Sequence, residues 1–478
     1  MKRRITTAIV LLLLVTAPDA SVAQKKSRTS VISEDNIRAE LGFLASDAMQ
    51  GRGSASGYER LAAEYIGSQF HQFGLEPGGD TDGSGHRSFV QQVPLNGIRF
   101  KTPPTLRVTS ENQTTTWTFG TDFLVSFLRS ANLSGDLQII DADATPTKGA
   151  VALIKLPDGI DAQKRQNIVR KARTAQAAAV LLLETEANKK AREAGDVRLP
   201  NLPSRIGGTA NSDAAFATIS LSQQMFDTLA SISSPARVVL SGDTEPVGNS
   251  ASWNAIGILR GSDPKAAQEV IMLSAHLDHL GVTENPIGAD AIFNGADDDA
   301  SGCVAVLELA RVLGSGKRPK RTIYFIGFGS EERGGFGSQY FISNSPVPLP
   351  QIVADITFEM LGRPDAKVPP NTLWLTGFER SDLGPELAKH GALIVADPHP
   401  EQNFFQRSDN YRLALQGIVA HTVSSFGLHT DYHRVSDDIS KIDFPFMTQS
   451  IQSMVKPIRW LANSRFKPTW VPGKAPTR

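Results

Sequence analysis

The side chains most suited to chemistry are imidazoles and carboxylates that recur through the middle and late parts of the chain. They are His276, Asp278, the run Asp297–Asp299, Glu331, Glu332, Glu359 and His433. Several of them directly follow apolar runs such as Val270–Leu273 and Thr322–Phe328. Polar groups at the ends of buried strands are typical of a catalytic or metal site.

Two His and three carboxylates together suit a borderline ion such as Zn²⁺, and one carboxylate can bridge two ions about 3.5–4 Å apart. Glu331, adjacent to a ligand-type residue, would then be free to act as a general base on water. Each residue alone has an ordinary alternative. Asp299 or Ser301 could cap the helix that follows, and Glu331 with Glu332 could be an exposed pair. The joint pattern indicates chemistry.

The sequence around these side chains alternates between strand and helix patterns. The predicted strands are Val270–Ser274, Thr322–Phe328, Ile352–Phe358, Leu373–Thr376 and Ile418–Val423, and the predicted helices are Ala300–Leu313, Gly335–Ser343 and Phe446–Leu461. Such alternation predicts an α/β fold whose mostly parallel sheet is covered by helices on both faces. His276, Glu331, Glu332 and Glu359 then fall at the carboxyl ends of strands, where active residues gather.

The remaining sequence predicts a segmented domain organisation. Residues 34–74 carry two amphipathic helical patterns separated by a glycine-rich stretch, and residues 24–119 are assigned to the first part of the main domain. Residues 120–246 combine buried-strand patterns with a charged helix and hold few catalytic candidates, which indicates an inserted binding or lid module. Residues 247–478 form the main part.

Composition excludes several kinds of partner and predicts export. The 478 residues include 49 Lys and Arg against 49 Asp and Glu, so no basic field is present to hold nucleic acid. Cys303 is the only cysteine, which rules out an intramolecular disulfide. Lys2–Arg4, the apolar Ile9–Val15 and the small residues Ser21–Ala23 predict a signal peptide, residues 1–23, and a periplasmic or secreted protein. An uncleaved anchor is the alternative; no later segment is long enough to span a membrane.

Five short motifs carry a resemblance to a known family. They are Ser274–Asp278, Gly295–Gly302 (GADDDASG), Gly329–Glu332, Phe358–Gly362 and His429–His433. In this order and spacing the sequence resembles the M28 family of zinc aminopeptidases, over most of residues 34–465. Leu44–Asp47 with Gly51–Gly53, and Arg407–Asp409, are similar to further family segments. Residues 120–246 resemble a protease-associated insertion.

The resemblance implies a phosphorylase/hydrolase-like exopeptidase fold and two zinc ions per chain. Asp297 would bridge the ions, with His276 and Glu359 on one and Glu332 and His433 on the other. Glu331 would be the general base, and Asp278 would orient His276. A cis peptide would follow the bridging residue, at Asp297–Asp298.

Four assignments keep alternatives. Asp355 could replace Glu359, because well-known members carry Asp at that position, and His429 could replace His433. Tyr432 is expected either to donate to an oxyanion or to pack beside the site. Asp437 is either an orienting partner of His433 or a turn residue.

The expected activity is hydrolysis of N-terminal peptide bonds, with peptide or protein N-termini as substrates. A carboxypeptidase or dipeptidase of the same fold, a one-zinc glutaminyl cyclase and an inactive binding protein are the alternatives. The sequence does not indicate substrate preference or oligomeric state.

Overall fold

The computed structural model describes residues 31–477 except 112, 158, 196, 198, 200–204, 207–215 and 284–288. The predicted signal peptide therefore lies outside the described residues. The chain divides into two compact units, one of Met1–Gln91 with Trp253–Arg478 and one of Gln92–Ser252. Within the described residues, no helix combines the length and apolar character that crossing a membrane requires.

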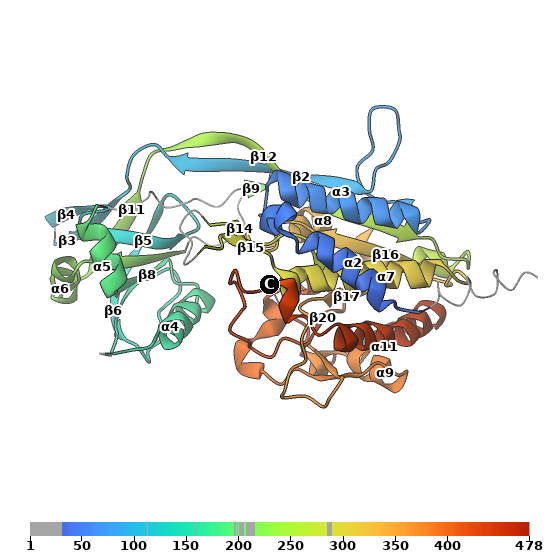
Figure 1. Cartoon of the computed structure of the whole chain (residues 1–478). Coiled ribbons are helices and arrows are strands. Elements are labelled where there is room, and N and C mark those ends of the chain that lie inside the picture. The colour runs from blue at the N-terminus through green and yellow to red at the C-terminus, as the bar shows by residue number, and fades with distance from the viewer. Residues whose placement is uncertain are drawn as a thin grey trace, which may run out of the picture. The chain divides into compact units, whose positions relative to one another are not determined.

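The first unit is built on a mixed sheet (Figure 1). Its strands, in order across the sheet, are β19 (Ile394–Ala396), β18 (Leu373–Leu375), β20 (Ala420–Ser424), β17 (Ile352–Phe358), β13 (Val270–His276), β16 (Thr322–Phe328) and β12 (Thr244–Leu259). The central four strands β20, β17, β13 and β16 are parallel, whereas β18 runs antiparallel to β20 and β12 runs antiparallel to β16. β1 (Glu76–Pro77) also pairs with β12, and β14 (Gly281–Val282) and β15 (Ile292–Phe293) form a separate ribbon. The carboxyl ends of the four parallel strands meet at one edge.

Alternate residues of the central strands supply the two halves of the core. Leu273 and Phe325 face a cluster that includes α2 (Glu34–Leu44), α3 (Gly57–Gln72), α7 (Gly302–Gly314), α9 (Leu383–Lys389) and α11 (Phe444–Asn463). Met272 and Tyr324 face a second cluster with α8 (Phe336–Ser343) and α10 (Asn410–Ala414). Helices therefore cover both faces, as the sequence predicts.

Helix α7 is buried along almost its whole length because it packs under the central strands. Its first residue, Gly302, lies so close to the Phe358 carbonyl of β17 and to the Asp299 carboxylate that a Cβ atom would collide with both. The glycine that closes the motif Gly295–Gly302 is therefore required for the close approach of this helix to the strand. This contact positions the Asp run beside the end of β17.

The second unit has its own eight-stranded sheet and its own core. The strand order is β4 (Gln113–Thr118), β3 (Thr105–Ser110), β11 (Ala236–Ser241), β6 (Leu133–Asp141), β7 (Val151–Lys155), β8 (Ala179–Leu183), β10 (Ala217–Leu221) and β5 (Phe123–Leu128). Its helices are α4 (Ala162–Thr174), α5 (Glu186–Glu193) and α6 (Gln223–Ala230), and a short strand β9 (Arg205–Ile206) pairs with β2 (Val90–Phe100).

The predicted α/β class is confirmed, but the predicted start of the inserted module at residue 120 is wrong. The unit begins at Gln92, because β3 pairs with β11 and β4 pairs with β3, so residues 105–118 belong to the second sheet. The predicted end at 246 lies close to the observed end at Ser252. Its protease-associated character stays a prediction.

Candidate metal and active site

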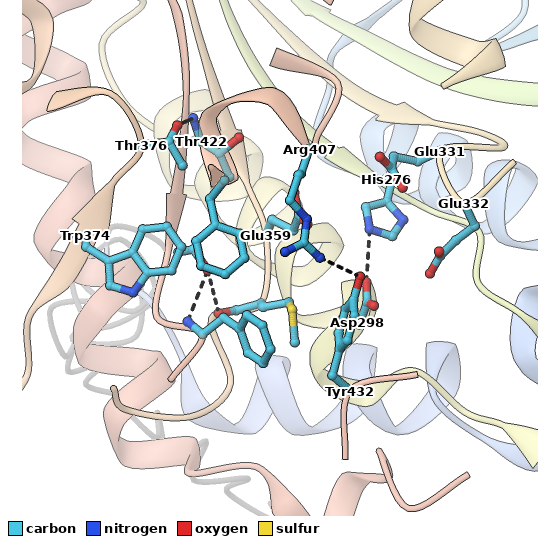
Figure 2. Close-up of a pocket in the computed structure, with 14 residues that line it drawn as sticks. His276, Asp298, Glu331, Glu332, Glu359, Trp374, Thr376, Arg407, Thr422 and Tyr432 are labelled. Atoms are coloured by element: carbon cyan, nitrogen blue, oxygen red, sulfur yellow. Dashed lines mark hydrogen bonds and ion pairs between the residues drawn. The ribbon is translucent and has the colours of Figure 1, made fainter. Parts of the chain in front are cut away.

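The carboxyl ends of β13, β16 and β17 surround a pocket in the first unit (Figure 2). The lining residues are His276, Asp298, Glu331, Glu332, Glu359, Met360, Trp374, Thr376, Phe404, Arg407, Thr422, Ser424, Phe426 and Tyr432. One side of the pocket thus carries the imidazole and carboxylate groups, and the other carries aromatic rings and hydroxyl groups.

The three consecutive aspartates before α7 point in three different directions. Asp297 accepts a hydrogen bond from the Gly362 N–H at 2.7 Å, and its other oxygen lies 2.9 Å from Nε2 of His429. Asp299 accepts from the backbone N–H groups of His276, Gly302 and Met360. These two residues therefore tie the loop to neighbouring elements.

Asp298, the middle aspartate, is the one that faces the pocket. Its Oδ1 lies 3.1 Å from Nε2 of His276, and its Oδ2 lies 3.2 Å from Nε2 of His433. The structure therefore contradicts the placement of Asp297 as the bridging residue, since the carboxylate of Asp297 is turned to Gly362 and His429. The cis peptide is likewise one residue later than expected, between Asp298 and Asp299.

His276 is the last residue of β13, and Asp278 lies beside it. Nδ1 of His276 is 3.2 Å from the Asp278 carbonyl oxygen and 3.8 Å from its carboxylate. The Asp278 carboxylate also accepts from the N–H groups of Glu331 and Glu332, and from Oγ of Ser54 at 2.5 Å. Asp278 is thus placed both to fix the His276 ring and to anchor the glutamate loop.

The loop after β16 is held from a second direction by Glu59 of α3. Glu59 is buried, and its Oε1 accepts from both the N–H and the hydroxyl of Ser330. Ser330 itself has a φ of 50°, in the left-handed region. Contacts from Glu59 and Asp278 therefore fix the backbone that presents Glu331 and Glu332 to the pocket.

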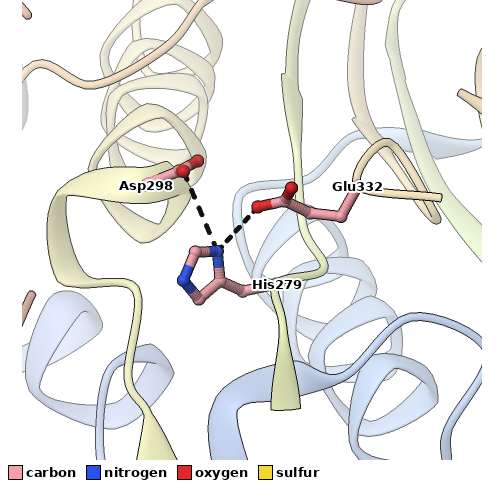
Figure 3. Close-up of side chains that lie close together, drawn as sticks. All are labelled: His279, Asp298 and Glu332. Atoms are coloured by element: carbon pink, nitrogen blue, oxygen red, sulfur yellow. Dashed lines mark hydrogen bonds and ion pairs between the residues drawn. The ribbon is translucent and has the colours of Figure 1, made fainter. Parts of the chain in front are cut away.

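Glu332 bonds two imidazoles, one of which the sequence did not identify. Its Oε2 lies 3.2 Å from Nε2 of His433, and its Oε1 lies 2.8 Å from Nδ1 of His279. His279, Asp298 and Glu332 together form a cluster whose spacing could hold a metal ion (Figure 3). The only signal for His279 was its place three residues after His276.

The structure places the alternative ligand Asp355, and the expected orienting residue Asp437, away from the pocket lining. Glu359 lines the pocket, whereas Asp355 lies inside the sheet, where it bonds the hydroxyls of Ser274 and Thr357. Asp437 does not contact His433. Its two oxygens accept from the N–H groups of Asp297 and Asp298, so it positions the Asp loop.

Tyr432 lines the pocket, with its ring stacked on that of His433 at a centroid distance of 3.9 Å. Both expected roles, a donor to an oxyanion and a packing residue, are compatible with this position. The assignment of its hydroxyl as a donor stays a prediction.

The electrostatics of the pocket reflect an excess of acidic groups. Burial acts to lower the pKa of His433, but contacts with Asp298 and Glu332 outweigh it and raise that pKa to about 10. Burial acts to raise the pKa of Glu332, yet the contacts with His279 and His433 bring it down to about 2. The imidazoles and carboxylates thus stabilise opposite charges in each other.

The two acidic groups without such partners shift the other way. Burial, with the charge of Asp298 added to it, raises the pKa of Glu359 to about 7. Burial also raises the pKa of Glu331 well above its usual value, and neighbouring carboxylates reinforce the effect. A glutamate with a raised pKa in a buried pocket can hold and release a proton near neutral pH.

The donor set fits divalent zinc. Zinc–ligand bonds of 2.0–2.2 Å in a tetrahedral arrangement separate ligand atoms by about 3.3–3.6 Å. The contacts of Asp298 with His276 and His433, and of Glu332 with His433, span 3.1–3.2 Å. Nε2 of His433 is buried between two carboxylate oxygens without a hydrogen bond among the described residues. These residues could therefore hold a cation with little rearrangement.

Comparisons with known proteins relate the region that carries these residues to a known family. The sequence model of peptidase family M28 matches residues 254–456, a range that includes every ligand-type residue named above. Residues 254–456 form a peptidase domain of family M28. This match confirms the predicted family resemblance for residues 254–456, and the printed names of the sequence relatives include probable zinc metalloproteases.

Sequence relatives of the M28 domain match only part of their own length. The probable lipoprotein aminopeptidase LpqL of Mycobacterium tuberculosis is 27% identical over 47% of this chain and 39% of its own. The aminopeptidase YwaD of Bacillus subtilis is 32% identical over 24% of this chain and 23% of its own. The chain thus spans well under two thirds of these relatives.

Solved structures resemble the whole chain more evenly. An aminopeptidase from Aneurinibacillus sp. strain AM-1 matches with a TM-score of 0.54 and 20% identity, covering 94% of this chain and 98% of that one. A zinc aminopeptidase from Bacillus subtilis matches with a TM-score of 0.51 and 18% identity, covering 92% and 97%. At these identities the likeness concerns the fold alone.

Proposed function

We propose that the chain is an exported zinc aminopeptidase that hydrolyses N-terminal peptide bonds at a two-metal site. The observation that carries the proposal is that the two oxygens of Asp298 face two different imidazoles, while Glu331 lines the same pocket. The M28 domain and the printed names of its relatives support zinc and peptide chemistry. The basic and apolar N-terminal sequence supports export.

In this proposal Asp298 would contribute to holding both ions. His276 and Glu359 would hold one of them, and Glu332 and His433 would hold the other. Bound zinc would polarise the scissile carbonyl and lower the pKa of the attacking water.

The protein's own side chains would transfer the proton from the attacking water to the leaving amine and would keep the reacting groups in position. Glu331, which is not assigned as a ligand, would take a proton from the attacking water and pass it to the leaving amine. Its raised pKa favours both steps, because the carboxyl must be deprotonated for the first and protonated for the second. Asp278 would keep this glutamate in place through the Glu331 N–H, and Asp437 would do the same for Asp298.

A matched pair of variants tests the metal site. Asp298→Ala should lose both zinc ions, because this carboxylate alone faces both imidazoles. Asp297→Ala should retain most of its zinc while losing some stability, because its carboxylate bonds Gly362 and His429 instead. Zinc per chain would be measured by elemental analysis, with hydrolysis of aminoacyl-anilides measured alongside.

Two results would contradict the proposal. Full zinc retention by Asp298→Ala would remove the bridging role. One zinc per chain in the unmodified protein, without anilide hydrolysis, would favour the one-zinc glutaminyl cyclase alternative.

A further inference from the structure

One pocket residue has no part in the proposed hydrolysis. Among the described residues that line the pocket, Arg407 alone carries a permanent positive charge. It projects between the aromatic side of the pocket and the ligand-type residues (Figure 2). Arg407 is exposed, so its guanidinium can be reached by a substrate that enters the pocket.

The contacts of Arg407 are aromatic. Its guanidinium carbon lies 4.9 Å from the ring centre of Phe404 and 5.9 Å from that of Tyr432, and Nη2 donates to the Tyr432 hydroxyl at 3.4 Å. The ion pairs found among the described residues do not include one to Arg407, whereas nearby Arg363 bonds Asp431 at 2.8 Å. Stacked rings hold a guanidinium in place while leaving its N–H groups available.

Charge balance indicates what those N–H groups meet; this step rests on the proposed two-zinc function. Two divalent ions would offset the charge of the four carboxylates that line the pocket, those of Asp298, Glu331, Glu332 and Glu359. The positive charge of exposed Arg407 would then face a substrate that enters the pocket. A negative group on that substrate would pair with it.

We propose that Arg407 forms a carboxylate-binding subsite, so that the enzyme prefers substrates with a carboxylate close to the scissile bond. A planar guanidinium binds a carboxylate through two parallel hydrogen bonds. Tyr432 joins the subsite to the metal site, because its ring contacts the guanidinium on one side and stacks on His433 on the other. The carboxylate is either the C-terminus of a dipeptide or the side chain of an acidic N-terminal residue.

Paired substrates separate these two sources. One pair is Leu-Ala and its C-terminal amide; the other is the anilides of glutamate and glutamine. For zinc-loaded enzyme, kcat/KM should be about 10–100-fold higher for the acid in at least one pair, since a charge-assisted hydrogen bond is lost in the neutral partner. The pair that shows the difference identifies the carboxylate.

Variants assign the preference to Arg407. In Arg407→Gln the acid-to-neutral ratio should fall to about one, while the zinc content changes little. Arg407→Lys should keep part of the ratio, and Arg60→Gln, an exposed change on α3, should keep all of it. Equal rates for both members of both pairs, or a ratio that survives Arg407→Gln, would overturn the subsite. Failure of the unmodified, two-zinc enzyme to hydrolyse any of the four substrates would overturn the proposed function and the subsite with it.

Discussion

Glu331 and Glu332 are neighbours in sequence but differ in their side-chain contacts. Glu332 bonds His279 and His433 and has a lowered pKa, whereas Glu331 faces the pocket with a raised pKa. This difference supports a ligand role for one and a base role for the other, with the shared support of Asp278 to both N–H groups.

Exchange of either glutamate for glutamine should separate chemistry from metal binding. Glu331→Gln should lower kcat by about 10²–10⁴-fold with little change in KM or zinc content, because proton transfer is not used in ground-state binding. Glu332→Gln should weaken zinc binding, and added zinc should partly restore its activity. Steady-state kinetics and zinc content of both proteins check this. Loss of zinc from Glu331→Gln alone would reverse the two roles.

The sequence could predict that a carboxylate lies before α7, but not which one. Three identical side chains in a row differ only in direction, and that direction depends on the backbone of the loop. Asp298 has φ −105° and ψ 99°, which interrupts the helical geometry and turns its side chain to the pocket. The N–H groups that fix this conformation meet Asp437, about 140 residues later, and such a distant contact has no local signal.

At the scale of elements, strands were predicted better than the loops that join them. Thr322–Phe328 and Ile352–Phe358 match β16 and β17, because buried parallel strands read as continuous apolar runs. For the glycine-rich stretch after α2, the sequence showed only a similarity to a family segment and did not predict a structural role. The structure shows that it carries Arg52, a buried cation that bonds three other chain segments.

Arg52 donates to the backbone carbonyls of Leu44, Leu277, Asn294 and Gly295 at 2.6–3.0 Å. It thereby ties α2, the end of β13 and the loop before Asp297 into one unit. The sequence could not reveal this, because an arginine between glycines usually lies in an exposed turn.

Replacement of Arg52 should destabilise the first unit strongly. Arg52→Met would remove a donor from four buried carbonyl groups, of which that of Gly295 still accepts from the Ala300 N–H. Each of the other three losses costs about 1–3 kcal/mol, so the free energy of unfolding should fall by at least about 3 kcal/mol. The exposed control Arg60→Met, whose partner Glu64 is 3.6 Å away, should change it by less than about 1 kcal/mol. Urea denaturation of both variants provides the measurement. Equal stability of the two would show that the Arg52 bonds contribute little.

At the scale of the whole molecule, the sequence predicted two units but misplaced their boundary. Strand β3 is short and alternates in polarity, and β4 is short and almost wholly polar, so their sequence patterns do not indicate which sheet they join. Their assignment depends on the pairing of Thr105–Ser110 with Ala236–Ser241, a contact across more than a hundred residues. Strand pairing over such a distance depends on the whole folded sheet, so the local sequence does not predict it.

The stability of the whole molecule should depend on His421, which is buried in the first unit outside the pocket. Nδ1 lies 2.7 Å from the Thr376 carbonyl and therefore carries the proton, and Nε2 lies 2.7 Å from the Ser381 hydroxyl. Burial lowers the pKa of His421 to about 4, below the usual value near 6.5. Between these values the unfolded chain binds a proton that the folded chain does not.

The free energy of unfolding should therefore be insensitive to His421 above pH 6.5 and fall as the pH decreases toward 4, by about 3 kcal/mol in all. His421→Gln should remove this contribution. Urea denaturation at several pH values, compared between the two proteins, isolates it from other titrating groups. Identical pH slopes would show that His421 is protonated equally in both states.

The solitary thiol of Cys303 lies at the start of α7, where it is buried and donates to the carbonyl of His276 at 3.1 Å. Burial raises its pKa, so the thiol stays protonated and a reagent cannot reach it while the surrounding structure is closed. Labelling of Cys303 can therefore report on local opening of the structure. Because this sulfur is the sole target for a thiol reagent, its labelling rate measures how often the region beneath the proposed metal site opens. Bound metal should lower that rate.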